Sequence, residues 1–314
     1  MIQRSQNTIA RPAAVAGVGF LTGADIRLRF LPAAAGHGIA FLRTDKLCAP
    51  PIPALVSYTI PRTRRTAIAR CGIVVEMVEH VLAALAGLQI DNCLVELDGP
   101  EPPGCDGSSL LFAETLLSTG IVDQGVPRER LELRQNVVVQ GDGGQTVSGG
   151  PHSSGSGNNG PVNNGSVISG AGTDGRLHLN YSLDYGPNSP IEQQQYSFVL
   201  SPETFLAEIA FARTFLLEHE AHALRAQGYG KRTTAKDLLI FGPNGIIDNT
   251  LRAPDECARH KILDCIGDLA LAGCDLAGVV TARRSGHQLN AEFVRQAKLA
   301  HAETIWPGLA LKAA

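Results

Sequence analysis

Residues 259–268 have the sequence RHKILDCIGD, and they decide how the rest of the chain is interpreted. At 3.6 residues per turn, His260, Asp264 and Asp268 fall one turn apart and lie on one stripe of a helix. The opposite side of this helix is apolar and consists of Ile262, Leu263, Ile266, Leu269 and Ala270. An imidazole and a carboxylate one turn apart can bind the same metal ion. The pattern predicts a helix that is anchored by its apolar face and presents metal ligands.

The expected bounds of this helix follow from its flanking residues. Pro254, Asp255 and Glu256 suit a first turn, and Gly273 suits the position after the end. An alternative is a solvated polar face that contains a histidine by chance, because such spacings are common on helices. The choice depends on whether other parts of the chain supply the missing ligands.

A second apolar segment, residues 73–86, has helical spacing and is followed by Gly87, which predicts a helix. Glu79 and His80 lie in the middle of this segment and must be solvated, paired or bound to a metal. Neighbours on a helix point about 100° apart. His80 could therefore bind a metal while Glu79 reaches a water on it. The alternative is a histidine bonded to a carbonyl and a glutamate that extends to solvent.

Composition limits the class of protein. The chain has 314 residues, of which 44% are hydrophobic, enough for one large or two modest domains with proper cores. A net charge of −3 argues against a general nucleic-acid binder, so no nucleic-acid partner is expected. An anionic ligand would have to be held by local cations.

The seven cysteines form an odd set without a C-x-x-C motif, which indicates neither a disulfide framework nor a thiolate zinc site. A reducing compartment, the cytoplasm, is expected. Arg4 and Arg11 precede a short apolar run at residues 13–21, but Gly17 and Gly19 interrupt it, so export is not expected. No run approaches the roughly 18 apolar residues of a membrane span, so no integral membrane segment is predicted.

Predicted strands and helices interleave in both halves of the chain. Strands are predicted at residues 25–31, 38–43, 93–97, 131–139, 177–185, 195–200, 237–241 and 276–282. Further helices are predicted up to about residue 118, from 201 to 210, up to 228, and from about 290 to 301. This order predicts an α+β fold of two two-layer α/β sandwich domains.

We expect a linker at residues 122–130, with an N-terminal domain over 1–125 and a C-terminal domain over 126–314. Residues 141–175 contain 12 glycines and are dominated by Gly, Ser and Asn, which predicts a flexible insertion between two strands, with His152 as a solvated bystander.

The candidate residues combine into one site. A catalytic zinc usually has three protein ligands and one position open to water, and His80, His260 and Asp264 supply that number. The ion would lower the pKa of a water bound to it to about 7. Glu79 would take the proton, and His287 could stabilise an oxyanion if Asp268 keeps it protonated.

These residues and the motifs around them resemble the UDP-3-O-acyl-N-acetylglucosamine deacetylase family of lipid A synthesis (LpxC). The motifs occur in the family's order and read VEH at 78–80, ALAG at 84–87, IDN at 90–92, CDGS at 105–108, ARTF at 212–215, HKILDCIGD at 260–268 and SGHQLN at 285–290. The resemblance covers nearly the whole chain except residues 141–175. Departures from the family pattern include Met77, where a threonine commonly stands, and residues 216–217 and 228–232.

The resemblance implies a zinc-dependent hydrolase that removes acetate from the glucosamine nitrogen of a UDP-linked acylated sugar. It also implies two α+β domains with the zinc ion between them. We expect such a protein to act as a monomer whose partner is its small-molecule substrate.

The family's residue roles are transferred by position. The residues that match its zinc ligands are His80, His260 and Asp264. Glu79 matches the general base, His287 the second acid/base histidine and Asp268 the carboxylate that orients it. Thr214 matches a hydroxyl beside the scissile carbonyl.

The resemblance also implies substrate contacts. Phe215 matches a residue that packs on the sugar, and Lys261 matches a cation near the polar head of the substrate. Asp184 and Tyr185 occupy the place of an Asp-Phe pair at the uridine.

Two other functions are consistent with parts of the pattern. One is a non-catalytic carbohydrate or nucleotide binder with a structural zinc, for which a closed set of four protein ligands is expected. The other is a metal-free acid/base enzyme, such as an acyl hydratase that uses Glu79 and His80, which would stay active after chelation.

Overall fold

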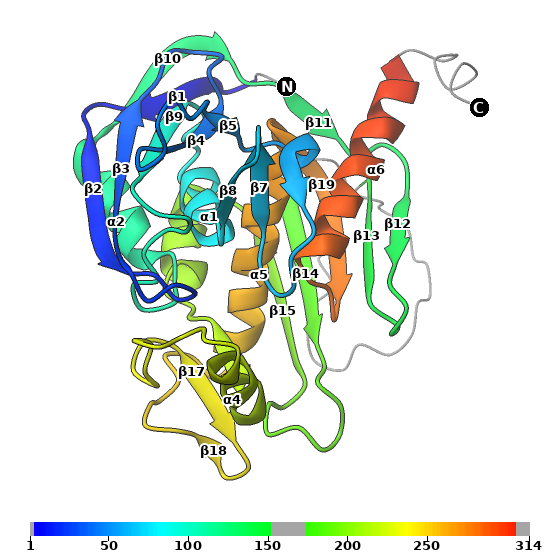
Figure 1. Ribbon diagram of the computed structural model, residues 1–314. Coiled ribbons are helices and arrows are strands. Elements are labelled where there is room, and N and C mark those ends of the chain that lie inside the picture. The colour runs from blue at the N-terminus through cyan, green and yellow to red at the C-terminus, as the bar shows by residue number, and fades with distance from the viewer. Residues whose placement is uncertain (1–2, 152–173, 306–314) are drawn as a thin grey trace.

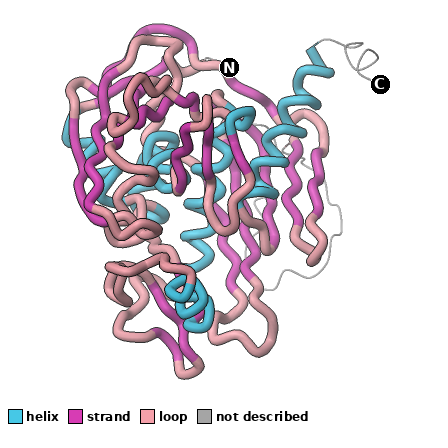
Figure 2. Tube along the Cα trace, viewed as in Figure 1, coloured by secondary structure: helices cyan, strands magenta, loops and turns pink. Residues whose placement is uncertain are grey.

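The computed structural model describes residues 3–151 and 174–305. Two sheets and the helices packed on them form the body of the molecule, with strands at both flanks and helices through the middle (Figure 2). The α+β class expected from the sequence is confirmed. The boundary between residues 125 and 126 stays a prediction.

The N-terminal half contains a five-stranded sheet. Its strand order is β2 (Ala13–Val18), β3 (Asp25–Pro32), β9 (Cys93–Leu97), β4 (Ile39–Arg43) and β5 (Ile52–Pro53). In β3, Ile26, Leu28 and Phe30 are buried while Arg27 and Arg29 are exposed, as the alternation of the sequence predicts. The helices of this half are α1 (Glu79–Gly87) and α2 (Leu110–Thr119).

Smaller elements complete the N-terminal half. A three-stranded antiparallel sheet consists of β6 (Thr59–Ile60), β7 (Ala67–Arg70) and β8 (Ile73–Glu76), after the short helix η1 (Val56–Tyr58). A two-stranded sheet joins β1 (Ser5–Ile9) to β10 (Ile121–Pro127).

The C-terminal half is built on a six-stranded sheet. Five strands follow the order β12 (Val137–Gln140), β13 (Thr146–Gly150), β19 (Asp275–Arg283), β14 (Leu177–Leu183) and β15 (Gln194–Val199), and β11 (Arg130–Glu132) pairs with β19. The helices α5 (Glu256–Leu269) and α6 (His287–Ile305) pack on this sheet. The chain also forms α3 (Pro202–Thr204), the π-helix η2 (Phe205–Ile209) and η3 (Ala270–Ala272).

A small unit projects from the body at the lower edge of Figure 1. It consists of β16 (Phe215–Leu217), α4 (Glu218–Ala226), β17 (Leu239–Gly242) and β18 (Gly245–Ile246). Ala221, Leu238 and Ile240 form its own buried apolar cluster, separate from the main core.

The predicted helix over 73–86 is wrong in its first part. Residues 73–76 form β8, which pairs with β7 across a turn at Gly72, and α1 begins only at Glu79. A short apolar run rich in β-branched residues fits a strand as well as a helix, and pairing with β7 decides between them. Met77 follows β8 with a positive φ of 57°, which separates strand from helix. Glu79 and His80 therefore lie in the first turn of α1.

Three other expectations need correction. The predicted linker at 122–130 contains the strand β10, which the sequence hides because its partner β1 lies more than a hundred residues away. The predicted insertion at 141–175 contains β13, which pairs with both β12 and β19. Residues 152–173, including His152, lie outside the described residues. The segment that leads to Gly228 starts as β16 and becomes helical only at Glu218.

The close approach of α1 and α5 determines where the functional side chains meet. A Cβ placed on Gly267 would lie 2.1 Å from the main-chain oxygen of Glu79. Only glycine allows this distance, because backbone cannot retreat as a flexible side chain can. Gly267 thus lets α5 bring its polar stripe up to the first turn of α1.

We predict that Gly267→Ala lowers the free energy of unfolding by about 1–3 kcal/mol, because the added methyl group forces the two helices apart. Urea unfolding followed by circular dichroism measures this loss. Gly286→Ala is the control, since a Cβ at that position meets nothing within 4 Å. Equal stability of the two variants would contradict the close packing described here.

Candidate metal centre and catalytic pocket

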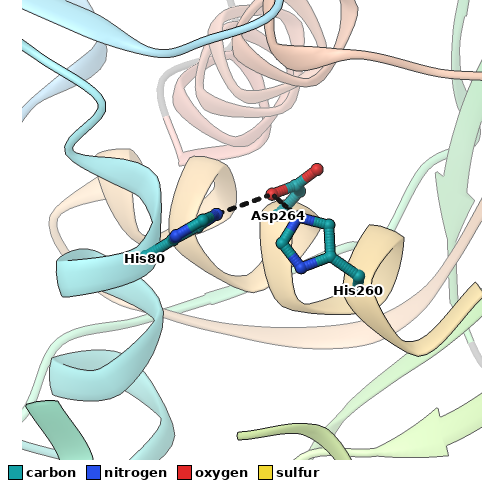
Figure 3. Close-up of side chains that lie close together, drawn as sticks. All are labelled: His80, His260 and Asp264. Atoms are coloured by element: carbon teal, nitrogen blue, oxygen red, sulfur yellow. Dashed lines mark ion pairs between the residues drawn. The ribbon is translucent and has the colours of Figure 1, made fainter. Parts of the chain in front are cut away.

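Three side chains from two helices converge at the contact between α1 and α5. His80 comes from α1, and His260 and Asp264 come from successive turns of α5 (Figure 3). The Nε2 atoms of His80 and His260 lie 3.7 and 3.4 Å from Asp264 Oδ1. One ligand atom from each of the three residues lies within 4.8 Å of the others, and all three residues are buried. The structure therefore brings the predicted metal ligands together.

The chemistry of this donor set suits a zinc ion. Zinc–nitrogen distances of about 2.0–2.1 Å in a tetrahedral site place neighbouring donors about 3.3 Å apart, close to the separations observed. The Ala212 carbonyl lies 3.0 Å from His260 Nδ1, which leaves Nε2 of that ring directed at Asp264. Burial lowers the pKa of His260 to about 4, so the ring is neutral and can act as a ligand.

Asp264 is held in its charged form. Burial opposes the charge, but Lys261, followed by His260, holds the pKa of this carboxyl well below its usual range. Lys261 Nζ lies 2.6 Å from Asp264 Oδ2, and although desolvation opposes the charge on Lys261, the Asp264 carboxylate raises its pKa well above the ordinary value. Lys261, expected to contact substrate, thus also fixes the second oxygen of a metal ligand.

Glu79 lies next to the three ligands and is almost fully buried. Its Oε2 accepts a hydrogen bond of 3.0 Å from the main-chain nitrogen of Thr66, while Oε1 lies 4.0 Å from His287 Nε2. Burial is the main cause that raises the pKa of Glu79. A carboxylate with a raised pKa is suited to accept and return a proton near neutral pH.

His287 is the first residue of α6, and its side chain reaches the same centre. Its Nδ1 lies 3.0 Å from Asp268 Oδ2, which orients the ring, and its Nε2 lies 4.0 Å from Asp264 Oδ2. Burial opposes protonation, but the carboxylates of Asp268, Glu79 and Asp264 raise the pKa of His287 to about 9. The ring is therefore a cation at neutral pH.

Sequence reasoning missed two residues that hold Asp268. Thr66 Oγ1 donates to Asp268 Oδ1 at 2.5 Å, and Asn290 Nδ2 donates to Asp268 Oδ2 at 2.8 Å. Thr66 thus contacts both Glu79 and Asp268 from the loop between β6 and β7. No spacing in the sequence marks Thr66, whereas Asn290 lies one helical turn after His287 and could have been noticed.

A single cavity of about 670 Å³ joins these groups to the residues expected to contact substrate. Ten of the eleven predicted site residues line it: Glu79, His80, Asp184, Tyr185, Thr214, Phe215, His260, Lys261, Asp264 and His287. Asp268 lies behind His287 and is fully buried. Phe215 packs edge-on against the rings of His260 and Tyr185, with centroids 6.0 and 5.9 Å away. Arg284 and Arg64 also line the cavity.

Comparison with known proteins relates this chain to one family. The sequence model of the family described as "LpxC: UDP-3-O-acyl N-acetylglycosamine deacetylase" matches residues 6–298. A protein of Myxococcus xanthus named UDP-3-O-acyl-N-acetylglucosamine deacetylase is 35% identical over 93% of this chain and 86% of its own length. A protein of Solibacter usitatus with the same name is 33% identical over 93% and 90%. A bifunctional enzyme LpxC/FabZ of Chlorobaculum tepidum is 35% identical over 93% of this chain and 64% of its own length.

We predict that Asp268→Asn lowers the pKa of His287 from about 9, because the carboxylate that raises it most is removed and burial continues to oppose protonation. Titration of the ring carbon signals by NMR in metal-free protein measures the change. The other histidine signals of the same spectra serve as the reference. An unchanged pKa in Asp268→Asn would mean that this carboxylate does not control the charge on His287.

The same shift implies a dependence of stability on pH. The folded-state pKa of His287 lies above the unfolded value, so its contribution is fully present below about pH 6.5 and is lost as pH rises through about 9.

Proposed function

This chain belongs to the LpxC family of UDP-3-O-acyl N-acetylglycosamine deacetylases, and from this premise we propose that it is a zinc-dependent amidase. Its substrate would be UDP-3-O-acyl-N-acetylglucosamine, and its reaction the hydrolysis of the N-acetyl group in lipid A biosynthesis. The convergence of His80, His260 and Asp264 beside Glu79 and His287 supports this proposal most directly.

His80, His260 and Asp264 would hold the zinc ion, and these three protein ligands leave a position open in a tetrahedral site. Zinc in such a site supplies a Lewis acid that activates water and polarises a carbonyl group. An open position distinguishes a catalytic site from the closed, four-ligand site of a protein with a structural zinc.

Glu79 would act as the general base. Its Oε2 is fixed by the main-chain nitrogen of Thr66, so Oε1 is the atom that faces His287 and the ligands. Oε1 would take a proton from the water that attacks the acetyl carbonyl. Because burial raises the pKa of Glu79, the carboxyl group can hold this proton and release it later in the reaction.

His287 would act on the same acetyl group as an acid, with its Nε2 4.0 Å from Glu79 Oε1. Its protonated Nε2 would donate a hydrogen bond to the oxygen on which negative charge develops, and would then donate its proton to the leaving amine. Asp268 keeps Nδ1 engaged and stabilises the positive charge on the ring until the Nε2 proton is transferred, after which the ring is neutral. Glu79 and His287 thus divide the two proton transfers between them.

The remaining residues of the cavity would position the substrate. We assign Thr214 to the scissile carbonyl, Phe215 to the sugar ring and Lys261 to the polar head. Asp184 and Tyr185 would contact the uridine. Tyr185 supports this assignment because it is 38% exposed, which leaves part of its ring free for stacking.

A second cavity, of about 720 Å³, adjoins the first and suits the acyl chain. Its lining contains many apolar side chains, including Phe20, Leu21, Met77, Leu216, Leu224, Leu238 and Ile240. Burial of a long acyl chain there would stabilise the complex by about 0.8 kcal/mol for each methylene group removed from water.

We further propose a cytoplasmic monomer. All seven cysteines are free, which suits a reducing compartment. Every predicted ligand and acid/base group comes from one chain, so the centre needs no second copy. Among the described residues, no helix has both the length and the apolar character needed to span a bilayer.

A deacetylase assay on the UDP-linked acyl sugar, with and without a chelator, tests the proposed function. We expect acetate release that stops on chelation and returns with added zinc, together with about one zinc per chain by elemental analysis. Full activity after chelation would favour a metal-free acid/base enzyme. Bound zinc without any acetate release would favour a non-catalytic binder.

Single substitutions separate the roles within the centre. Asp264→Ala should lose the metal, because one of three ligands is removed. Glu79→Ala should keep the metal and lose turnover by about 100-fold or more, and His287→Ala should do the same with the fold intact. Metal content, kcat and circular dichroism are measured on each variant. Wild-type turnover in Glu79→Ala would rule out its role as base.

A further inference from the structure

The loop between β6 and β7 lies at the boundary between the catalytic cavity and the apolar cavity. The residues that line both cavities are Arg62, Thr63, Arg64, Met77, Thr214 and Leu216, and three of these six belong to the loop. A chain that runs from the metal centre into the second cavity must therefore pass this loop. Its sequence, Arg62-Thr63-Arg64-Arg65, carries three cations in four residues.

The base of the loop is fixed. Glu76 of β8 accepts hydrogen bonds from Arg62 Nε at 2.6 Å and from Arg65 Nε at 2.7 Å. The carboxylate of Glu76 thus holds Arg62 and Arg65, which flank residues 63–64 at the tip of the loop. Arg64 lies between them in sequence with a positive φ of 61°, and its guanidinium pairs with Glu220.

The tip of the loop reaches the projecting unit. Arg64 forms an ion pair with Glu220 of α4, and the neighbouring Arg65 guanidinium lies 5.7 Å from the ring centroid of Tyr229. Glu220 is itself held, because its second oxygen accepts a hydrogen bond of 3.0 Å from the nitrogen of Leu217 at the start of α4. The ion pair therefore connects two rigid supports, the β6–β8 sheet and the α4 unit.

The two partners differ in exposure. The Arg64 side chain is 47% exposed and that of Glu220 is 15% exposed. An ion pair at this level of exposure is weak and is screened by salt. Breaking such a pair costs little free energy, unlike breaking the buried pairs around the metal centre.

We propose that Arg64 and Glu220 are specificity-determining residues, whose ion pair closes the side of the passage between the two cavities over a bound acyl chain. This inference rests on the proposed function, because it takes the ligand to be a UDP sugar with an acyl chain. A chain long enough to pass beneath the pair is shielded from water there. A short chain ends before the pair and gains nothing from it.

The test compares two substrates, the 3-O-dodecanoyl and 3-O-butanoyl forms of UDP-N-acetylglucosamine. Arg64→Gln should lower kcat/KM for the dodecanoyl substrate about tenfold. The change should be a higher KM, because about two methylene groups of the acyl chain become exposed to water. The butanoyl substrate should change less than twofold. Glu220→Gln, which keeps the acceptor for Leu217, should have the same effect, and the double variant should be no worse than either single variant.

Arg232→Gln is the matched control. Arg232, whose side chain is half-exposed, forms an ion pair of 2.9 Å with the exposed Asp25. This pair joins the loop after α4 to the N-terminal half, and Arg232 lines neither cavity. It should leave both substrates unaffected. Added salt should lower the preference of the wild type for the dodecanoyl substrate and leave that of Arg64→Gln unchanged.

An equal loss for both substrates in Arg64→Gln, or no loss for the dodecanoyl substrate, would overturn the inference. If the wild type hydrolyses neither substrate, the proposed function fails instead. Calorimetric titration with the two UDP sugars then decides the inference alone. Weaker binding of only the dodecanoyl sugar to Arg64→Gln would support it, and equal binding to both proteins would reject it.

Discussion

The architecture of this protein depends on the close contact between α1 and α5. Gly267 allows the backbone of one helix to touch the main chain of Glu79 on the other. His80 is then carried to the face of α5 that presents His260 and Asp264. The two helices belong to different halves of the chain, so neither half contains the metal centre. This contact links the packing of the core directly to the chemistry of the cavity.

The balance of buried charge follows from this geometry. Among the described residues, the cations that contact the carboxylates of Glu79, Asp264 and Asp268 are Lys261 and the protonated His287. A buried charge without a partner is costly, so each group is held by specific hydrogen bonds. The excess of negative charge favours binding of a divalent cation. A cation at the three ligands would also offset the repulsion between Glu79 and Asp264, which contributes to the raised pKa of Glu79.

The molecule separates a rigid centre from a periphery held by weaker contacts. The metal ligands and acid/base groups lie on helices α1, α5 and α6, which pack in the main core, where distances are fixed by packing. The α4 unit has a small apolar cluster of its own, and its contacts with the N-terminal half include two partly exposed ion pairs. Chemistry that requires fixed distances is thus placed on the core, and the border of the apolar cavity on elements joined by a partly exposed ion pair.

The sequence by itself determined the local part of the site. The stripe of His260, Asp264 and Asp268 depends only on helical periodicity, and the motifs around it were sufficient to indicate the family. Tertiary structure decided what local spacing cannot specify. Residues 73–76 form a strand because they pair with β7. Residues 121–127 form a strand because they pair with β1. Thr66 and the Arg64–Glu220 pair are invisible in the sequence, since their partners are distant along the chain and meet only when the two halves pack.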